Sequence, residues 1–295
     1  EKHLATLGVE LRDESREDNT GKEYDADNFS LFAQDEYQVL EALYLVMGAR
    51  YDEHSEFGSE LTPKVSLVWD INPHLKGKAS YGRGFRAPNI SELFITSWRQ
   101  RGRVIYAANP ELDPETSDSY EIGVEGHYGP FRGGLTLFRN DYKDLIEAEF
   151  VESLGSGQKR KDYYILGNVA RARTQGLELR GDLTLPLGFS LAAGAMWLDT
   201  ENRETGEELE GQPQFKGDLK LGYHNTALRL NANIRAIYYG EAYGAAADEA
   251  DCALVHCYVA KEVCTNTKLF AGIDNLFDDD EREPTLFYSG INVTF

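Results

Sequence analysis

The amino-acid sequence predicts an all-β fold, a transmembrane antiparallel β-barrel of which about 14 strands are present in the chain. Three observations support this prediction. Apolar residues recur at every second position, the connections alternate between short and long, and aromatic residues gather near the strand ends. Membrane barrels combine all three features, because their strands face lipid on one side and a polar lumen on the other.

The expected strands follow one another along the whole chain. They lie at about residues 3–13, 28–39, 42–53, 61–72, 75–86, 117–128, 131–150, 163–186, 188–199, 212–224, 227–240, 253–263, 267–276 and 285–295. The short connections are 40–41, 72–74, 129–130, 186–187, 225–226 and 264–266, and the longer polar ones are 14–27, 54–60, 87–116, 151–162, 200–211, 241–252 and 277–284. A soluble β-sandwich has no reason to keep such alternation, whereas membrane barrels have short turns at one end and long loops at the other.

Each expected strand rests on period-two alternation. Residues 228–236 show it most clearly, with apolar side chains at even positions and Arg or Asn at odd ones. In chain order, further apolar faces are Leu43, Leu45, Met47 and Tyr51; Leu177, Leu179, Leu183 and Leu185; Phe215, Leu219, Leu221 and Tyr223; and Phe287, Ile291, Val293 and Phe295. Alternation by itself also fits a soluble sheet. The opposite charges paired on the polar faces favour a wet lumen packed against other protein.

Composition restricts the function classes. The chain is 41% hydrophobic and 12% aromatic, too apolar for disorder. It has no run of 18 apolar residues, so no transmembrane helix is expected. A formal net charge of −20 argues against a nucleic-acid partner. The motifs G-x-S-x-G and H-E-x-x-H and a P-loop do not occur, so no enzyme, catalytic residue or cofactor is expected.

The three cysteines do not form a metal motif. Cys252, Cys257 and Cys264 are separated by five and seven residues, without a C-x-x-C pair. We therefore expect free, buried thiols and no metal site.

Two short boxes bracket one of the long connections. They are Phe85-Arg86-Ala87-Pro88-Asn89 and Asn109-Pro110-Glu111-Leu112. Together they resemble the strand–loop–strand segment of TonB-dependent outer-membrane receptors of the ferric siderophore and colicin I receptor type. Blocks similar to that family also occur at 32–37, 48–52, 113–117, 140–146, 174–179 and 271–278. Proline stops strand pairing, so we expect the two boxes to have a mainly architectural role at the rim of the wall.

The resemblance implies an active-transport receptor in the bacterial outer membrane, with energy supplied by the TonB system. Family barrels have about 22 strands around a plug. We therefore expect residues 1–295 to be the C-terminal part of such a barrel, without its plug. The expected partners are the TonB complex through that missing plug, lipopolysaccharide and other outer-membrane lipid, and the barrel-assembly machinery, which would read the terminal Phe295. Colicins and phages are further candidates.

The long connection between the boxes carries the expected ligand contacts. Guanidinium groups and aromatic rings suit an anionic, aromatic ligand such as a ferric catecholate siderophore. The candidate residues are Trp98, Arg99, Arg101, Arg103 and Tyr106. The other interpretation of these arginines is a solvated basic loop. Residues 90–108 contain no histidine, which disfavours haem. Cobalamin or haem import, a passive porin-like channel and a soluble lectin-like protein remain alternatives.

Overall fold

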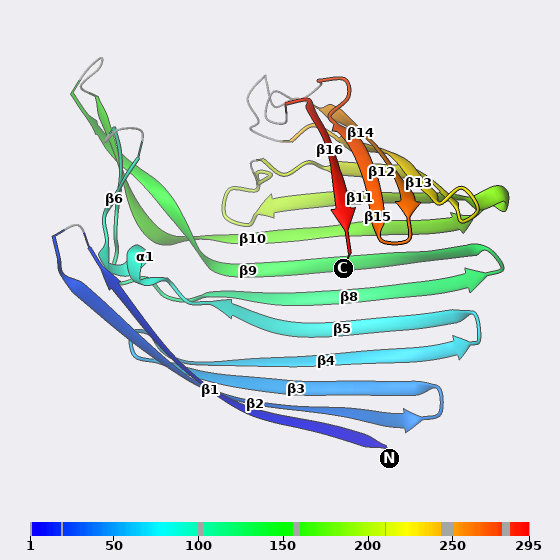
Figure 1. Ribbon diagram of the computed structural model, residues 1–295. Helices are drawn as coiled ribbons and strands as arrows, with labels where there is room; N and C mark the ends of the chain where they lie inside the picture. The colour runs from blue at the N-terminus through cyan, green and yellow to red at the C-terminus, as the bar shows by residue number, and fades with distance from the viewer. Residues whose placement is uncertain are drawn as a thin grey trace.

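The chain forms one curved antiparallel sheet in the computed structural model, which describes residues 2–18, 20–99, 103–155, 160–209, 211–242, 251–278 and 284–294 (Figure 1). The strands of the wall are β1 (His3–Glu17), β2 (Glu23–Leu40), β3 (Leu43–His54), β4 (Gly58–Asn72), β5 (Leu75–Arg86), β8 (Glu115–Tyr128), β9 (Phe131–Leu154), β10 (Lys161–Thr184), β11 (Phe189–Asn202), β12 (Phe215–Asn225), β13 (Leu230–Tyr239), β14 (Cys252–Cys264), β15 (Thr267–Asp274) and β16 (Leu286–Val293). Each pairs with the next in chain order, which confirms the predicted meander.

The connections between wall strands alternate as predicted. Connections at one end are turns of two to four residues, 41–42, 73–74, 129–130, 185–188, 226–229 and 265–266. Those at the other end are 18–22, 55–57, 87–114, 155–160, 203–214, 240–251 and 275–285, and all of them except 55–57 are longer than the turns. We call these the turn end and the loop end. The turn after β10 contains a short 3-10 helix, η3 (Pro186–Gly188). None of the described helices has the length and apolar character needed to cross a membrane.

Two hairpins at the loop end are longer than expected. The sequence predicted a loop over residues 14–27, but β1 and β2 stay paired up to Glu17 and Glu23. Likewise, β9 and β10 pair up to Leu154 and Lys161 within the expected loop 151–162. Outside the membrane, polar side chains are hydrated and the backbone hydrogen bonds between paired strands can continue. These two hairpins therefore extend beyond the membrane-spanning part of the wall.

Apolar side chains cover one face of the wall. Ile122, Leu137, Leu177, Trp197 and Phe215 occupy directly opposite positions on five consecutive strands. Much of this face is open, since Ile122 is 60%, Leu137 50% and Trp197 46% exposed. Soluble proteins rarely expose so large a contiguous apolar surface. The exposed apolar face thus belongs against lipid, and we call it the outward face.

Aromatic side chains bound the apolar band of the outward face. Phe189 and Trp197 lie eight residues apart on β11, about 26 Å along a strand. Barrel strands are tilted, so this is roughly 20 Å along the membrane normal, comparable to an apolar band about 25 Å tall. At the turn-end side, Phe189 packs on Tyr223 with ring centroids 4.8 Å apart. At the loop-end side, Phe215 packs on both Trp197 (5.1 Å) and Tyr238 (6.0 Å). These rings form the interfacial belts that the sequence indicated.

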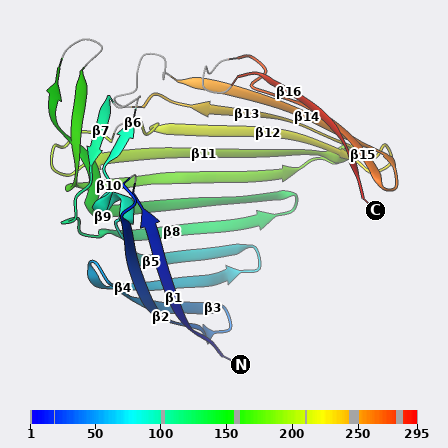
Figure 2. The ribbon, with the colours of Figure 1, turned by 60° about the vertical axis from the view of Figure 1, so that its left-hand side comes forward.

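The described wall does not close on itself. The strand order begins at β1 and ends at β16, and these two strands do not pair with each other (Figure 2). An edge strand presents unpaired backbone N–H and C=O groups, which a membrane-spanning sheet must satisfy with further strands. Both edges of the described wall, β1 and β16, are thus open to pairing with further strands.

The cysteines only partly follow expectation. Cys257 and Cys264 are free thiols, as predicted; Cys252 is buried and Cys257 is half-buried. The expectation of burial is wrong for Cys264, which is exposed at the end of β14, where the strand meets a turn.

Candidate functional site at the loop end of the wall

The connection between the two boxes folds into a small ordered unit, which we call the box loop (residues 87–114). It contains the helix α1 (Ile90–Phe94) and the hairpin strands β6 (Ser97–Arg99) and β7 (Val104–Ala107). Asn89 caps the helix, because its side chain accepts hydrogen bonds from the backbone N–H groups of Ser91 and Glu92. The Glu92 carboxylate in turn accepts from the Asn89 N–H at 2.9 Å. This reciprocal capping box starts a helix of barely more than one turn.

The first box anchors the box loop through Arg86, at the end of β5. Its guanidinium donates to Glu115 at 2.6 and 2.8 Å and to Glu92 at 3.0 and 3.1 Å. Burial by itself would raise the pKa of Glu115, but the Arg86 guanidinium and the Ile146 N–H together hold that pKa below its ordinary value. The hydrogen bond to Glu115 raises the pKa of Arg86, so the pair is charged at neutral pH.

The second box ties the box loop to β10. The Asn109 side chain donates to the Leu166 carbonyl at 2.9 Å, and the Asn109 N–H donates to the Glu92 carbonyl at 2.9 Å. Beyond the box, the Asn168 side chain accepts from the Asp113 N–H and donates to the Asp113 and Asp144 carbonyls. These contacts hold the second box against the wall, and the mainly architectural role of the boxes stays a prediction.

The remaining box residues surround these anchors. Phe85 and Arg86 end β5, while Pro88 and Leu112 are buried. Ala87 is half-buried, Pro110 and Glu111 are exposed, and the Glu111 N–H donates to the Asn109 side chain. Their role in the rim stays a prediction.

Apolar side chains of the box loop are buried to a degree unusual for a surface connection. Ile90, Leu93, Ile105 and Leu112 are each at most 5% exposed. The helix α1 also contacts β1 and β2, and the Phe94 ring stacks on Tyr24 of β2 at 5.0 Å. The box loop is thus held by β2 on one side and β10 on the other.

Aromatic side chains from three segments meet where β7 joins the wall. Strand β7 runs parallel to β10, with Tyr106 opposite Tyr164. The Tyr106 and Tyr164 rings stack at 5.3 Å, and Phe150 of β9 meets Tyr164 edge-on at 5.6 Å. We call Tyr106, Phe150 and Tyr164 the aromatic platform. The Asp162 N–H donates to the Arg103 carbonyl at 2.8 Å, which places the exposed Arg103 at the same junction.

The structure describes only some of the predicted ligand residues in full. Arg103 and Tyr106 come together beside β10, as described above. Trp98 and Arg99 lie in β6, opposite Ile105 and Val104. Their side chains, and the whole of Arg101, lie outside the described residues, as does Phe295.

Sequence reasoning missed Phe150 and Tyr164, although Tyr163-Tyr164 stands out as an aromatic pair in a polar stretch. It also missed Asn168, for which no sequence signal exists. Among the described residues, no three His, Cys, Asp or Glu side chains are grouped as metal ligands.

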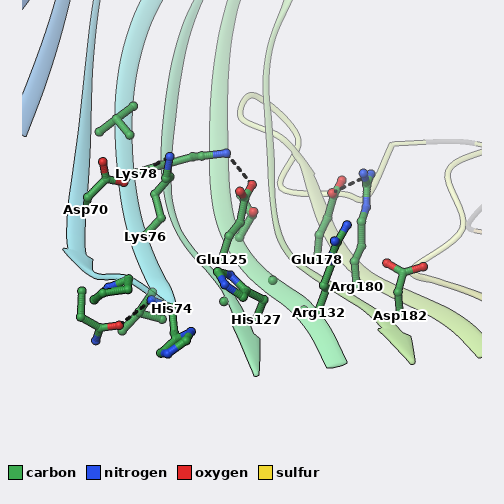
Figure 3. Close-up of a pocket in the computed structure, with 18 residues that line it drawn as sticks. Asp70, His74, Lys76, Lys78, Glu125, His127, Arg132, Glu178, Arg180 and Asp182 are labelled. Carbon is green, nitrogen blue, oxygen red and sulfur yellow. Dashed lines mark hydrogen bonds and ion pairs between the residues drawn. The ribbon is translucent and has the colours of Figure 1, made fainter. Parts of the chain in front are cut away.

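A second concave region lies on the inward face at the turn end. It is a hollow of about 1230 Å³ between β4 and β10, lined by charged side chains of both signs (Figure 3). Lys78 pairs with Glu125, Arg180 with Glu178, and Lys76 with Asp70 at 3.2 Å. A small anionic ligand would meet as many carboxylates as cations there. A mixed surface of this kind suits a folded polypeptide better.

Comparison with known families decides what this wall is. The profile described as TonB dependent receptor-like, beta-barrel matches residues 5–276.

The chain belongs to the TonB-dependent receptor family.

It is accordingly a portion of an outer-membrane β-barrel, in a family of transporters rather than enzymes.

Several relatives are ferric siderophore receptors. The chain is 31% identical over 283 residues to the ferric enterobactin receptor of Pseudomonas aeruginosa, an alignment that covers 85% of this chain and 37% of the relative. It is 28% identical over 284 residues to the ferrienterobactin receptor of Escherichia coli, with 86% and 37% covered. The vitamin B12 transporter BtuB of Photobacterium profundum is 27% identical over 274 residues, with 89% and 41% covered.

Solved structures of this TonB-dependent receptor family share the fold. A crystal structure of the Pseudomonas aeruginosa ferric enterobactin receptor aligns with a TM-score of 0.82 at 24% identity, covering 99% of this chain and 51% of that one. The chain thus spans about two fifths of the curated relatives (37% of the first) and half of the solved receptor.

Proposed function

We propose that this chain is the C-terminal barrel portion of an importer that binds a ferric siderophore at its loop end and uses energy from the TonB system. The observation that carries the proposal is the junction of the box loop with β10. There the Asp162 N–H of β10 donates to the carbonyl of the exposed Arg103, two residues before Tyr164 of the aromatic platform of Tyr106, Phe150 and Tyr164. Guanidinium groups pair with anionic oxygens and stack on rings, so the junction suits a ligand that is both anionic and aromatic.

The arginine-rich hairpin between β6 and β7 extends this junction. Arg99 and Arg103 frame the hairpin, with Arg101 between them in the chain. Supporting the proposal, the relatives in Pseudomonas aeruginosa and Escherichia coli are named for ferric enterobactin. The hairpin lacks histidine, which speaks against haem as the transported ligand.

The unpaired edges of β1 and β16 support the view that other polypeptide completes the wall. In this proposal that polypeptide supplies further strands and a plug, and the TonB complex acts through the plug. The mixed-charge hollow on the inward face is suited to such a plug. Phe295 would serve as the signal that the barrel-assembly machinery reads.

A growth assay tests the proposal. The receptor gene is expressed in an iron-limited host that lacks its own siderophore receptors, with and without a working TonB. The panel contains a ferric catecholate, a ferric hydroxamate and haem, with cyanocobalamin tested in a cobalamin-dependent host. TonB-dependent rescue by the catecholate is expected. Rescue only by cobalamin or haem would replace the ligand, and TonB-independent leakage of all solutes would indicate a passive channel.

A further inference from the structure

The β9–β10 hairpin carries two bulges on its way to the loop end. Ala172 pairs with Tyr142 and Ala170 pairs with Leu145, so β9 has one extra residue in this interval. In the next step of the pairing, up to Asn168, the extra residue lies on β10. A bulge bends its strand, and β9 and β10 turn together away from the neighbouring strands at the loop end (Figure 1). We call the part beyond the bulges, residues 145–154 and 161–168, the outer arm.

The bulge on β9 contains an unusual backbone conformation. Asp144 has a φ of 57°, in the left-handed region that few residues other than glycine adopt. Such conformations persist where the surrounding structure holds them in place. The Asn168 side chain does this, because its amide N–H donates to the Asp144 carbonyl at 2.7 Å.

The same amide fastens the returning end of the box loop. Asn168 Oδ1 accepts from the Asp113 N–H at 2.7 Å, and Asn168 Nδ2 donates to the Asp113 carbonyl at 2.8 Å. A side-chain amide has two N–H donors, and here they serve the Asp113 and Asp144 carbonyls. One half-buried side chain therefore joins the box loop, the bulge of β9 and the base of the outer arm.

The aromatic platform depends on the angle at this junction. Phe150 and Tyr164 lie opposite each other on the outer arm, whereas Tyr106 belongs to the box loop. Tyr164 lies four residues beyond Asn168, about 13 Å along the strand, so a rotation of about 10° at the bulges would move it by roughly 2 Å. Binding groups need to be held within about 0.5 Å. The contact between the Tyr106 and Tyr164 rings therefore requires a fixed junction.

We propose that Asn168 is a positioning residue of the ligand site. Its three hydrogen bonds set the direction of the outer arm against the box loop, so that the aromatic platform is formed before the ligand arrives. The inference rests on the proposed function, since it concerns the same site. Asn168 acts through the platform and is not itself a ligand contact.

The test measures the rates at which the full receptor, purified in detergent, binds and releases a ferric catecholate siderophore. In Asn168→Ala the platform-competent fraction should fall to about a tenth, so the affinity should fall about tenfold. The association rate constant should carry this loss, because the contacts in the bound state are unchanged. A residue that contacts the ligand behaves differently, since its loss mainly speeds dissociation. Arg103→Ala should show that second pattern.

Two further variants separate positioning from space filling and from general bracing. Asn168→Asp keeps the size of the side chain, but its carboxylate would face two carbonyls without an N–H donor, so it should bind no better than Asn168→Ala. A residue that only fills space would be replaced well by aspartate. Asn140→Ala is the matched control, because the Asn140 amide also links β9 to β10, donating to Thr174 at 3.1 Å on the wall side of the bulges. Its binding should equal that of the native receptor.

Hydrogen exchange without ligand tests the junction independently. The amides of β7, which pairs with the outer arm, should exchange faster in Asn168→Ala and at the native rate in Asn140→Ala. Heat-modifiable migration in gels checks that each variant is folded. Native rates of binding and exchange in Asn168→Ala would overturn the proposal, and so would faster dissociation with unchanged association. If the native receptor does not bind the siderophore, the transport proposal fails, whereas the exchange result still decides the role of Asn168 at the junction.

Discussion

Arg86 and Glu115 stand directly opposite each other where β5 and β8 end at the box loop, and their side chains join across the strand pair with an Nη2···Oε1 distance of 2.6 Å. Because Arg86 also binds Glu92 of α1, one guanidinium connects both ends of the loop to its helix. The Arg86 guanidinium therefore holds the two ends of the box loop together.

Replacing Arg86 with glutamine should loosen the box loop. The carboxylates of Glu92 and Glu115 would face each other without a cation, and the free energy of local opening should fall by about 1–3 kcal/mol. The lower end is expected, since 46% of the Arg86 side chain is exposed. Hydrogen exchange of the amides in residues 87–114 measures this. Arg180→Gln, which breaks an exposed pair elsewhere, should leave those amides unchanged. Unaltered protection in Arg86→Gln would contradict the anchor role.

The box loop should also open in acid. The pKa of Glu115 is depressed in the folded state, so the stability it contributes is present above its ordinary pKa, near 4.3, and is lost as the pH falls through the lower folded value. Pepsin cleavage within residues 87–114 should therefore accelerate below about pH 4. A Glu115→Gln variant should be cleaved faster at the upper end of this range and show a flatter pH dependence. A variant as steep as the native chain would exclude Glu115 as the titrating group.

The cap of α1 offers a third prediction. Asn89→Ala removes the acceptor for the Ser91 and Glu92 N–H groups, and should cost about 1 kcal/mol of local stability. Ser91→Ala is the matched control, because the Ser91 hydroxyl is buried without a recorded partner among the described residues. Hydrogen exchange of residues 90–95 compares the two. Equal effects would mean that the cap does not hold the helix.

The orientation of the wall makes a fourth prediction. Leu219 lies on the outward face between Ala193 and Ala236, midway between the aromatic belts. Leu219→Arg should therefore destabilise the barrel in lipid vesicles by about 2–4 kcal/mol. Lys220→Arg places the same side chain one residue away on the inward face and should be nearly neutral. Urea unfolding in vesicles measures both, and equal stability of the two variants would contradict the assigned orientation.

Sequence patterns predict the wall well because the lipid imposes a rule on every second residue. Leu177 and Leu179 alternate with Glu178 and Arg180, and that alternation survives in the structure as two faces. The heights of the hairpins were harder to predict. Above the membrane the alternation rule no longer applies, so the sequence predicted a loop over residues 14–27. In the structure, β1 and β2 stay paired within that range, up to Glu17 and Glu23.

The candidate site was only partly predictable. Arg103 and Tyr106 could be chosen from their side-chain chemistry, but Phe150 and Tyr164 join them through the parallel pairing of β7 with β10, which no local pattern encodes. The helix α1 was also missed, being only five residues long. Its capping signal, Asn89 followed three residues later by Glu92, was nevertheless present in the sequence.

The central claim is that the loop end binds a ferric siderophore through its arginines and rings. The most direct measurement is the affinity of the receptor for a ferric catecholate siderophore, compared with a variant in which Arg99, Arg101 and Arg103 are all alanine. Each lost charge-assisted hydrogen bond is worth about 1.5–3 kcal/mol, so we predict that affinity falls at least about tenfold, with the barrel still folded. An unchanged affinity would contradict the account.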